Sequence, residues 1–80
     1  MSERTVFRGM LVEKKMKYRA AKAQCEGLVI SLRGLINPFE EAEDLQIELI
    51  KNQADQLFKI CKECNDLRKE IRKIEQELEG

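Results

Sequence analysis

The sequence predicts an all-α fold: an antiparallel two-helix hairpin of the coiled-coil type, which pairs with a second copy to form a four-helix bundle. Each half of the chain carries apolar residues at alternating steps of three and four, the spacing of a helix packed against another helix. Between the halves, the stretch SLRGLINPFEE at 31–41 combines signals that end one helix with signals that begin the next.

The composition favours long helices over a sheet. The 80 residues are 42% apolar and 38% charged, with one proline and no tryptophan, and a chain this short forms one small domain over 1–80. Fifteen basic side chains balance fifteen acidic ones, so the whole chain is not an obvious polyanion binder. The two halves of the chain nevertheless differ in charge. Residues 1–35 carry eight basic and three acidic side chains, whereas residues 36–80 carry seven basic and twelve acidic ones.

The chain is expected to be cytoplasmic, with no membrane partner. No apolar run approaches the roughly 18 residues of a membrane span, and the stretch MSERTVFRGM lacks the apolar core of a signal peptide. Three cysteines, an odd number, favour free thiols over a disulfide scaffold.

The first helix is predicted over about 3–33. Its heptad seam consists of Phe7, Leu11, Lys14, Tyr18, Ala21, Cys25, Leu28 and Leu32. Lys14, the one polar exception, either extends its ammonium to water or fixes the register of the pair. The segment LVISL at 28–32 also suits a short strand, but no other segment would pair with it.

The second helix is predicted over about 38–77. Its seam consists of Ile50, Ala54, Leu57, Cys61, Cys64, Leu67, Ile71, Ile74 and Leu78. Two successive steps of three, from Cys61 to Leu67, indicate a stammer, which is a local overwinding of the coil.

The turn between the helices is predicted at 34–37. Gly34 suits the left-handed residue that ends a helix, in which case Leu35 would fold back on Ile30. Asn37 suits the N-cap of the next helix and Pro38 its first position. The short connection predicts antiparallel neighbours.

The predicted helices are unequal, so the second overhangs the first by roughly 13 Å. The overhang and several off-seam apolar residues need a cover, which predicts the homodimer. Ile36 and Phe39 at the joint are then either covered by the tail of the second copy, if the hairpins pair head to tail, or exposed as a docking point for a partner.

The motif CKEC, from Cys61 to Cys64, is compatible with a metal site but is interpreted here as core. The sequence has no histidine, and a turn near residue 36 would put Cys25 about 20 Å from Cys61 along the bundle. Two CKEC pairs from two subunits would be needed to complete a Cys₄ zinc site. No metal and no cofactor are therefore expected.

A basic cluster on the first helix is the candidate interaction patch, and it consists of Lys14, Lys15, Lys17, Arg19 and Lys22. It suits phosphate contacts on nucleic acid, or an acidic protein, with Tyr18 nearby. The alternatives are a solvated helix face or ion pairs between subunits. The predicted turn would place the cluster opposite 51–59.

Catalysis has little support, because the chain has no histidine, nucleophile elbow, phosphate loop or dinucleotide fingerprint. No catalytic residue is identified, and the protein is not expected to be an enzyme.

The stretch LVEKKMKYRAAKAQCEGLVISLRGLINPFEEAEDL resembles short uncharacterised helical proteins of Mu-like prophages, over roughly residues 6–50. The resemblance implies a bacterial or phage cytosolic setting and an accessory role near phage DNA. The main hypothesis is a non-enzymatic hairpin that self-associates and acts through contact with itself or another protein. The alternative is a small accessory protein that associates with DNA or a regulator through the basic face of the first helix.

Overall fold

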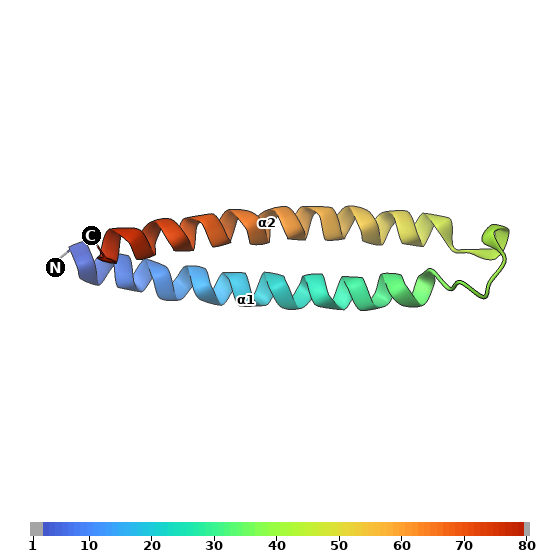
Figure 1. Cartoon of the computed structure of the whole chain (residues 1–80), viewed down its shortest axis with the longest axis horizontal. Coiled ribbons are helices and arrows are strands. Elements are labelled where there is room, and N and C mark those ends of the chain that lie inside the picture. Colours follow the sequence, from blue (N-terminus) through green and yellow to red (C-terminus); the bar gives the residue numbers. More distant parts are fainter. Residues whose placement is uncertain (1–2, 80) are drawn as a thin grey trace.

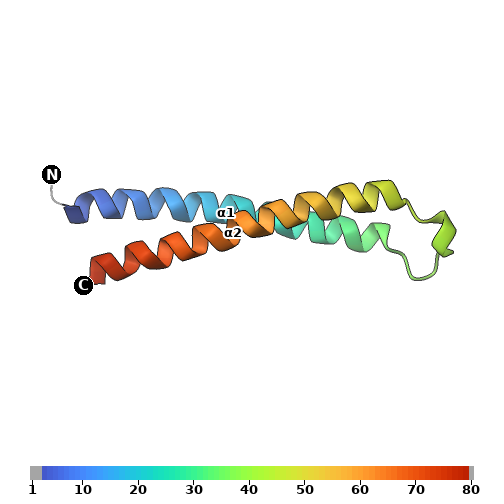
Figure 2. The same cartoon turned by 90° about the horizontal axis from the view of Figure 1, so that it is seen from above.

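The computed structural model describes residues 3–79, which form two long helices joined by a loop. Helix α1 spans Glu3–Leu35, a single 3-10 turn, η1, spans Ala42–Asp44, and helix α2 spans Ile47–Glu79. The helices lie antiparallel along their length (Figure 1) and cross when seen from above (Figure 2), as the strands of a supercoil do. The all-α hairpin is confirmed. The segment 28–32 is helical, so the strand alternative is wrong.

The seam of α1 is the predicted one. Ala21 is buried in it, and the other seven seam residues are half-buried. Helix α2 departs from the prediction, because its less exposed positions keep an unbroken heptad: Ile50, Gln53, Leu57, Ile60, Cys64, Leu67, Ile71, Ile74 and Leu78. The predicted stammer is wrong, and Cys61 is exposed beside the seam.

Packing explains the regular seam of α2, since an unbroken heptad stays in phase with α1 over its whole length. Gln53 occupies the seam where Ala54 was predicted. This position of Gln53 lowers the stability of the fold, because its Oε1 is buried with no hydrogen-bond partner among the described residues.

Gly34 does not end α1. No described residue has a positive φ, and the helical bonding continues past Gly34, with the Ile36 amide donating to the Leu32 carbonyl at 2.9 Å. Ile30 is 70% exposed, so it does not form the predicted contact with Leu35. The helix ends where Pro38 approaches, because a proline disfavours helical backbone at the residue before it.

We expect Gly34→Ala to raise the free energy of unfolding by about 0.5–1 kcal/mol, since alanine is the better helix former. A Cβ at Gly34 would meet no atom within 4 Å. Urea unfolding followed by circular dichroism measures the change. A loss of about 1 kcal/mol or more would instead indicate a left-handed glycine at this position.

Asn37 caps a single turn rather than a helix. Its Oδ1 accepts a hydrogen bond from the Phe39 amide at 3.0 Å, and its carbonyl accepts one from the Glu40 amide at 3.2 Å. Helix α2 begins at Ile47, nine residues after the predicted start at Pro38. Helices gain most of their stability from packing, and the seam of α2 begins at Ile50, so residues 38–46 have no apolar row to hold against α1.

The two helices are therefore equal, at 33 residues each, and the predicted overhang is wrong. The Arg4 guanidinium donates to the Leu78 carbonyl at 2.7 Å, which joins the two helices at the end away from the loop. The longer loop also shifts the register, so that Lys14 meets Glu70 and Cys25 meets Cys61.

The hairpin is long and thinly packed. Its dimensions are 61 × 17 × 14 Å and its radius of gyration is 18.1 Å, against about 12 Å for a compact chain of this length. The buried residues among 3–79 are Ala21, Leu67, Ile71 and Ile74. Ala21 lies at the middle of α1, and the other three lie in the half of α2 near the chain ends. Neither helix, within the described residues, carries a stretch long and apolar enough to cross a membrane.

Candidate functional site

Two grooves between the helices meet at Lys22 and form one continuous surface. The groove nearer the loop, here called the apolar groove, is lined by Lys22, Cys25, Glu26, Val29, Ile30, Leu57 and Cys61. The groove nearer the chain ends, here called the basic groove, is lined by Lys15, Tyr18, Arg19, Lys22, Arg68, Ile71, Arg72 and Glu75. Together they are called the two-helix face.

Helical spacing explains why these residues share a surface. On α1, the groove residues are separated by three, four or seven positions, a spacing that keeps side chains on one side of a helix. They are Lys15, Arg19, Lys22 and Val29. On α2, the groove residues are separated by four or seven positions and also share one side of the helix: Leu57, Cys61, Arg68 and Arg72. The antiparallel register then sets the two rows side by side.

The basic groove holds five cationic side chains and one carboxylate, that of Glu75. The ion pairs between side chains in residues 3–79 engage none of these five cations. The Arg68 guanidinium donates to the Asn65 side-chain oxygen, which leaves its charge uncompensated. The groove therefore presents unneutralised positive charge beside the aromatic ring of Tyr18.

The predicted basic cluster is split by the fold. Lys15, Arg19 and Lys22 line the basic groove. Lys14 is instead 2.9 Å from Glu70 of α2, and the hydrogen bond to that carboxylate raises the pKa of Lys14. Lys17 is 3.2 Å from Glu13 on its own helix.

The expectation that the basic cluster faces 51–59 is wrong, because the loop is longer than predicted and displaces the register. The cluster lies instead beside Arg68 and Arg72, which sequence reasoning missed as site residues. Their spacing of four residues was visible in the sequence, but their position opposite Lys15 and Arg19 depends on where the chain turns.

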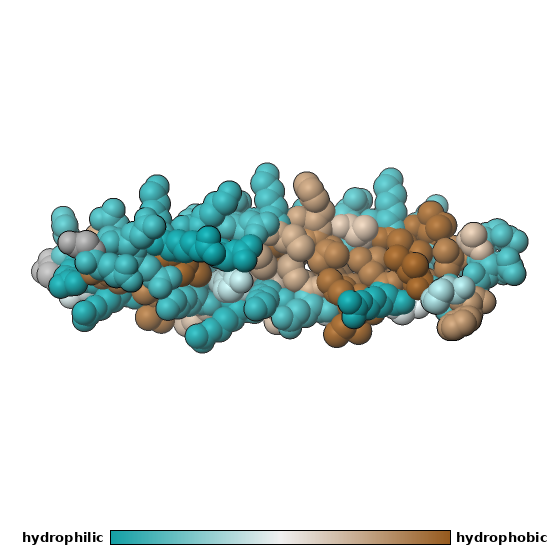
Figure 3. All heavy atoms as spheres, in the orientation of Figure 1, coloured by the Kyte–Doolittle hydropathy of each residue, from teal (hydrophilic) through white to brown (hydrophobic). Residues whose placement is uncertain are grey.

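The half of the molecule near the loop exposes much of its apolar surface. Ile30 is 70% exposed and Phe58 is 73% exposed, and none of the described residues from 22 to 66 is buried. On the face shown in Figure 3, apolar surface is concentrated in this half, whereas hydrophilic residues cover most of the half near the chain ends. Such a patch marks a binding surface more often than a solvated one.

The two residues of the predicted docking joint, Ile36 and Phe39, are exposed. Ile36 is 53% exposed and Phe39 is 95% exposed, the highest value among the large exposed apolar residues. They stand in the loop next to an acidic segment that consists of Glu40, Glu41, Glu43 and Asp44, called here the acidic loop.

The three thiols form a cluster, which corrects the predicted separation of about 20 Å. Cys25 Sγ lies 3.8 Å from Cys61 Sγ and 3.7 Å from Cys64 Sγ. Burial and the hydrogen bonds to both neighbours raise the pKa of Cys25 to about 12. All three cysteines are free. Within residues 3–79, no set of three or more Cys, His, Asp or Glu is arranged to hold a metal ion.

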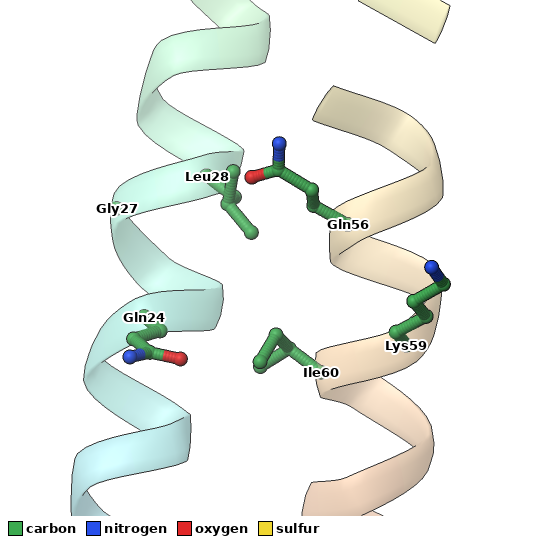
Figure 4. A pocket seen from close by; sticks show the side chains of 6 residues that line it. All are labelled: Gln24, Gly27, Leu28, Gln56, Lys59 and Ile60. Atoms are coloured by element: carbon green, nitrogen blue, oxygen red, sulfur yellow. The ribbon is translucent and has the colours of Figure 1, made fainter. Parts of the chain in front are cut away.

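A further groove opens between the helices at the level of Leu28 and Ile60. Both side chains point into the gap, and Gln24 and Gln56 form its rim (Figure 4). Gly27 also lines this groove, and a Cβ there would meet no atom within 4 Å. The lining offers apolar surface, two amides and the ammonium of Lys59, groups suited to packing and hydrogen bonding.

The described surfaces thus offer three kinds of chemistry: apolar contact, attraction of anions, and thiol oxidation. Comparison of the chain with protein-family models, with curated proteins and with solved structures finds no match.

Proposed function

We propose that this chain is a non-enzymatic cytoplasmic protein that self-associates through the two-helix face and acts by protein–protein contact. The observation that carries the proposal is the large surface that the hairpin leaves uncovered. The chain exposes 6601 Å², whereas a compact monomer of 9.4 kDa exposes about 5,000 Å².

The extra exposed surface matches the area that a stable dimer buries. About 1,600 Å² of extra surface on each chain corresponds to about 3,200 Å² in a pair, which lies within the range of obligate homodimers. The four buried residues among 3–79 also offset little of the entropy lost on ordering a chain of 80 residues. A second copy supplies the missing cover.

The charges select an antiparallel arrangement of the two copies. Ile47, where the loop ends, lies ten residues before Leu57, and Arg68 lies eleven residues after it, so each segment spans about 15 Å. A two-fold axis near Leu57 stacks the apolar grooves on each other. The same axis brings the acidic loop of each copy against the basic groove of the other, where unlike charges meet.

This pairing gives both the predicted bundle and the predicted joint a physical basis. Two hairpins in contact make a four-helix bundle. Ile36 and Phe39 are then covered by the middle of the second hairpin, and not by an overhanging tail.

We expect Ile30→Glu to abolish the dimer, because it places a carboxylate in the centre of the apolar contact. Sedimentation velocity at micromolar concentration measures the mass. The matched control is Met16→Glu, at a site of similar exposure, 64% against 70%, that does not line either groove. A folded wild-type monomer would overturn the proposal, as would an equal effect of the two substitutions.

A second candidate function is contact with nucleic-acid phosphates. The specific observation is the basic groove, where α1 and α2 together supply five cations and a single carboxylate, that of Glu75, beside Tyr18. Such a groove attracts a polyanion without reading its sequence, and an aromatic ring adds a stacking surface. This candidate agrees with the accessory role near phage DNA that the prophage resemblance implies, and it competes with the acidic loop of a second copy for the same groove.

A further inference from the structure

We propose that the thiol cluster is a modification site, at which a hydroperoxide converts Cys25 and a cysteine of the CKEC motif into a reversible disulfide between α1 and α2. The inference rests on the placement of the three thiols. Cys25 and Cys61 line the apolar groove, so the oxidation takes place on the single hairpin, before a second copy covers that groove.

The geometry favours a bond between the helices. Each of the separations from Cys25 Sγ, 3.8 Å to Cys61 and 3.7 Å to Cys64, exceeds a disulfide bond by less than about 2 Å. A side-chain rotation and a small approach of the helices close that gap. Cys25 is the member common to both pairs, so either bond ties α1 to α2.

The exposures assign the order of events. Cys61 is exposed, whereas Cys25 and Cys64 are half-buried, so the hydroperoxide reaches Cys61 first. Cys25 stays protonated at neutral pH because its pKa is raised to about 12, and a thiol reacts with peroxide far more slowly than a thiolate. Cys25 therefore does not react first with peroxide. It acts as the resolving partner because its sulfur already lies against Cys61 and Cys64, a proximity that offsets its low thiolate fraction.

The reaction is balanced by the peroxide alone. The Cys61 thiolate attacks one peroxide oxygen, so that an S–O bond forms, the O–O bond breaks, and water leaves after protonation. Cys25 sulfur then attacks the Cys61 sulfenic acid, so that an S–S bond forms, the S–O bond breaks, and a second water carries away the Cys25 proton. Two thiols lose two electrons in total, and the peroxide accepts both.

The third thiol allows the disulfide to change partner. When Cys25 is bonded to Cys61, Cys64 stands next to Cys25 and can displace Cys61 by thiol–disulfide exchange. The exchange moves the bond inward, from an exposed cysteine to a half-buried one. An external dithiol reverses either bond by the same chemistry.

The test treats the full chain with hydrogen peroxide at a low molar ratio, blocks free thiols and digests the protein with trypsin without reduction. Cleavage at Lys62 separates Cys61 from Cys64, so the two bonds give different peptides, each linked to residues 23–33. We expect both species, each lighter by two hydrogens and restored by dithiothreitol. The oxidised chain should also melt at a temperature higher by about 10 °C or more.

Three variants decide the assignment. Cys64→Ser and Cys61→Ser should each still form one bond to Cys25, the first faster than the second. Cys25→Ser should form no bond within the chain and should accumulate a sulfenic acid that dimedone traps. A bond between Cys61 and Cys64, or products that are exclusively disulfide-linked dimers, would overturn the proposal.

Discussion

Ile71→Ala is expected to lower the free energy of unfolding by about 2–5 kcal/mol, because it leaves a cavity in the best-packed part of the hairpin. Ile71 is 8% exposed and is one of three large side chains buried among residues 3–79. A chain this small has a total stability of only about 4–12 kcal/mol. The loss is therefore a large share of what holds the two helices together.

The matched control is Ile47→Ala, which removes the same atoms from a side chain that is 59% exposed. Its expected effect is within about 0.5 kcal/mol. Urea unfolding followed at 222 nm gives both values, with the protein concentration held fixed since self-association links stability to concentration. Equal losses at the two positions would show that the half near the chain ends is not the core.

Reversing two charges in the basic groove should weaken self-association about fivefold or more. In the proposed dimer, Arg68→Glu with Arg72→Glu turns attraction toward the acidic loop of the partner copy into repulsion. Surface pairs contribute about 0.2–1 kcal/mol each, and a charge reversal removes one attraction and adds a repulsion of similar size. Two reversals therefore change the free energy of association by about 1–4 kcal/mol. Sedimentation over a concentration series at low salt measures the dissociation constant.

The control variant reverses two lysine charges on a different side of α2. Lys73 lines a separate groove with Lys14 and Glu70, so Lys69→Glu with Lys73→Glu should leave association unchanged. Adding Glu41→Lys and Glu43→Lys to the groove variant should restore it. If the variant associates weakly and the loop substitutions bring no recovery, the acidic loop is not the occupant of the groove.

The same variants decide between the two candidate functions. If the groove binds nucleic acid, the protein should retard single-stranded or duplex DNA in a gel-shift assay at low salt. The affinity should fall steeply as salt rises, and the logarithm of the binding constant against that of the salt concentration should have a slope of up to about −4.5 for five cations on duplex DNA. Reversal of Arg68 and Arg72 would then abolish retardation and leave the dissociation constant of the dimer unchanged. No retardation by the wild-type chain would remove the second candidate.

Local rules in the sequence determined the helical class and the seam of α1. Eight positions from Phe7 to Leu32 keep their predicted place, because a heptad fixes which side of a helix is apolar whatever its partner is. The exposure of Ile36 and Phe39 also follows from local signals, since the chain turns next to both.

The tertiary structure alone decided which residues meet across the hairpin. Gly34 and Pro38 carry helix stop and start signals that are valid locally, but the helix ladder runs through Gly34, and Pro38 begins only a turn. The loop is therefore longer than predicted, and the register moves with it. That shift brings Arg68 and Arg72 to the basic groove and Cys25 to the CKEC motif. The physical reason is that a helical sequence specifies its own face, whereas its axial position against a partner depends on packing summed over both helices.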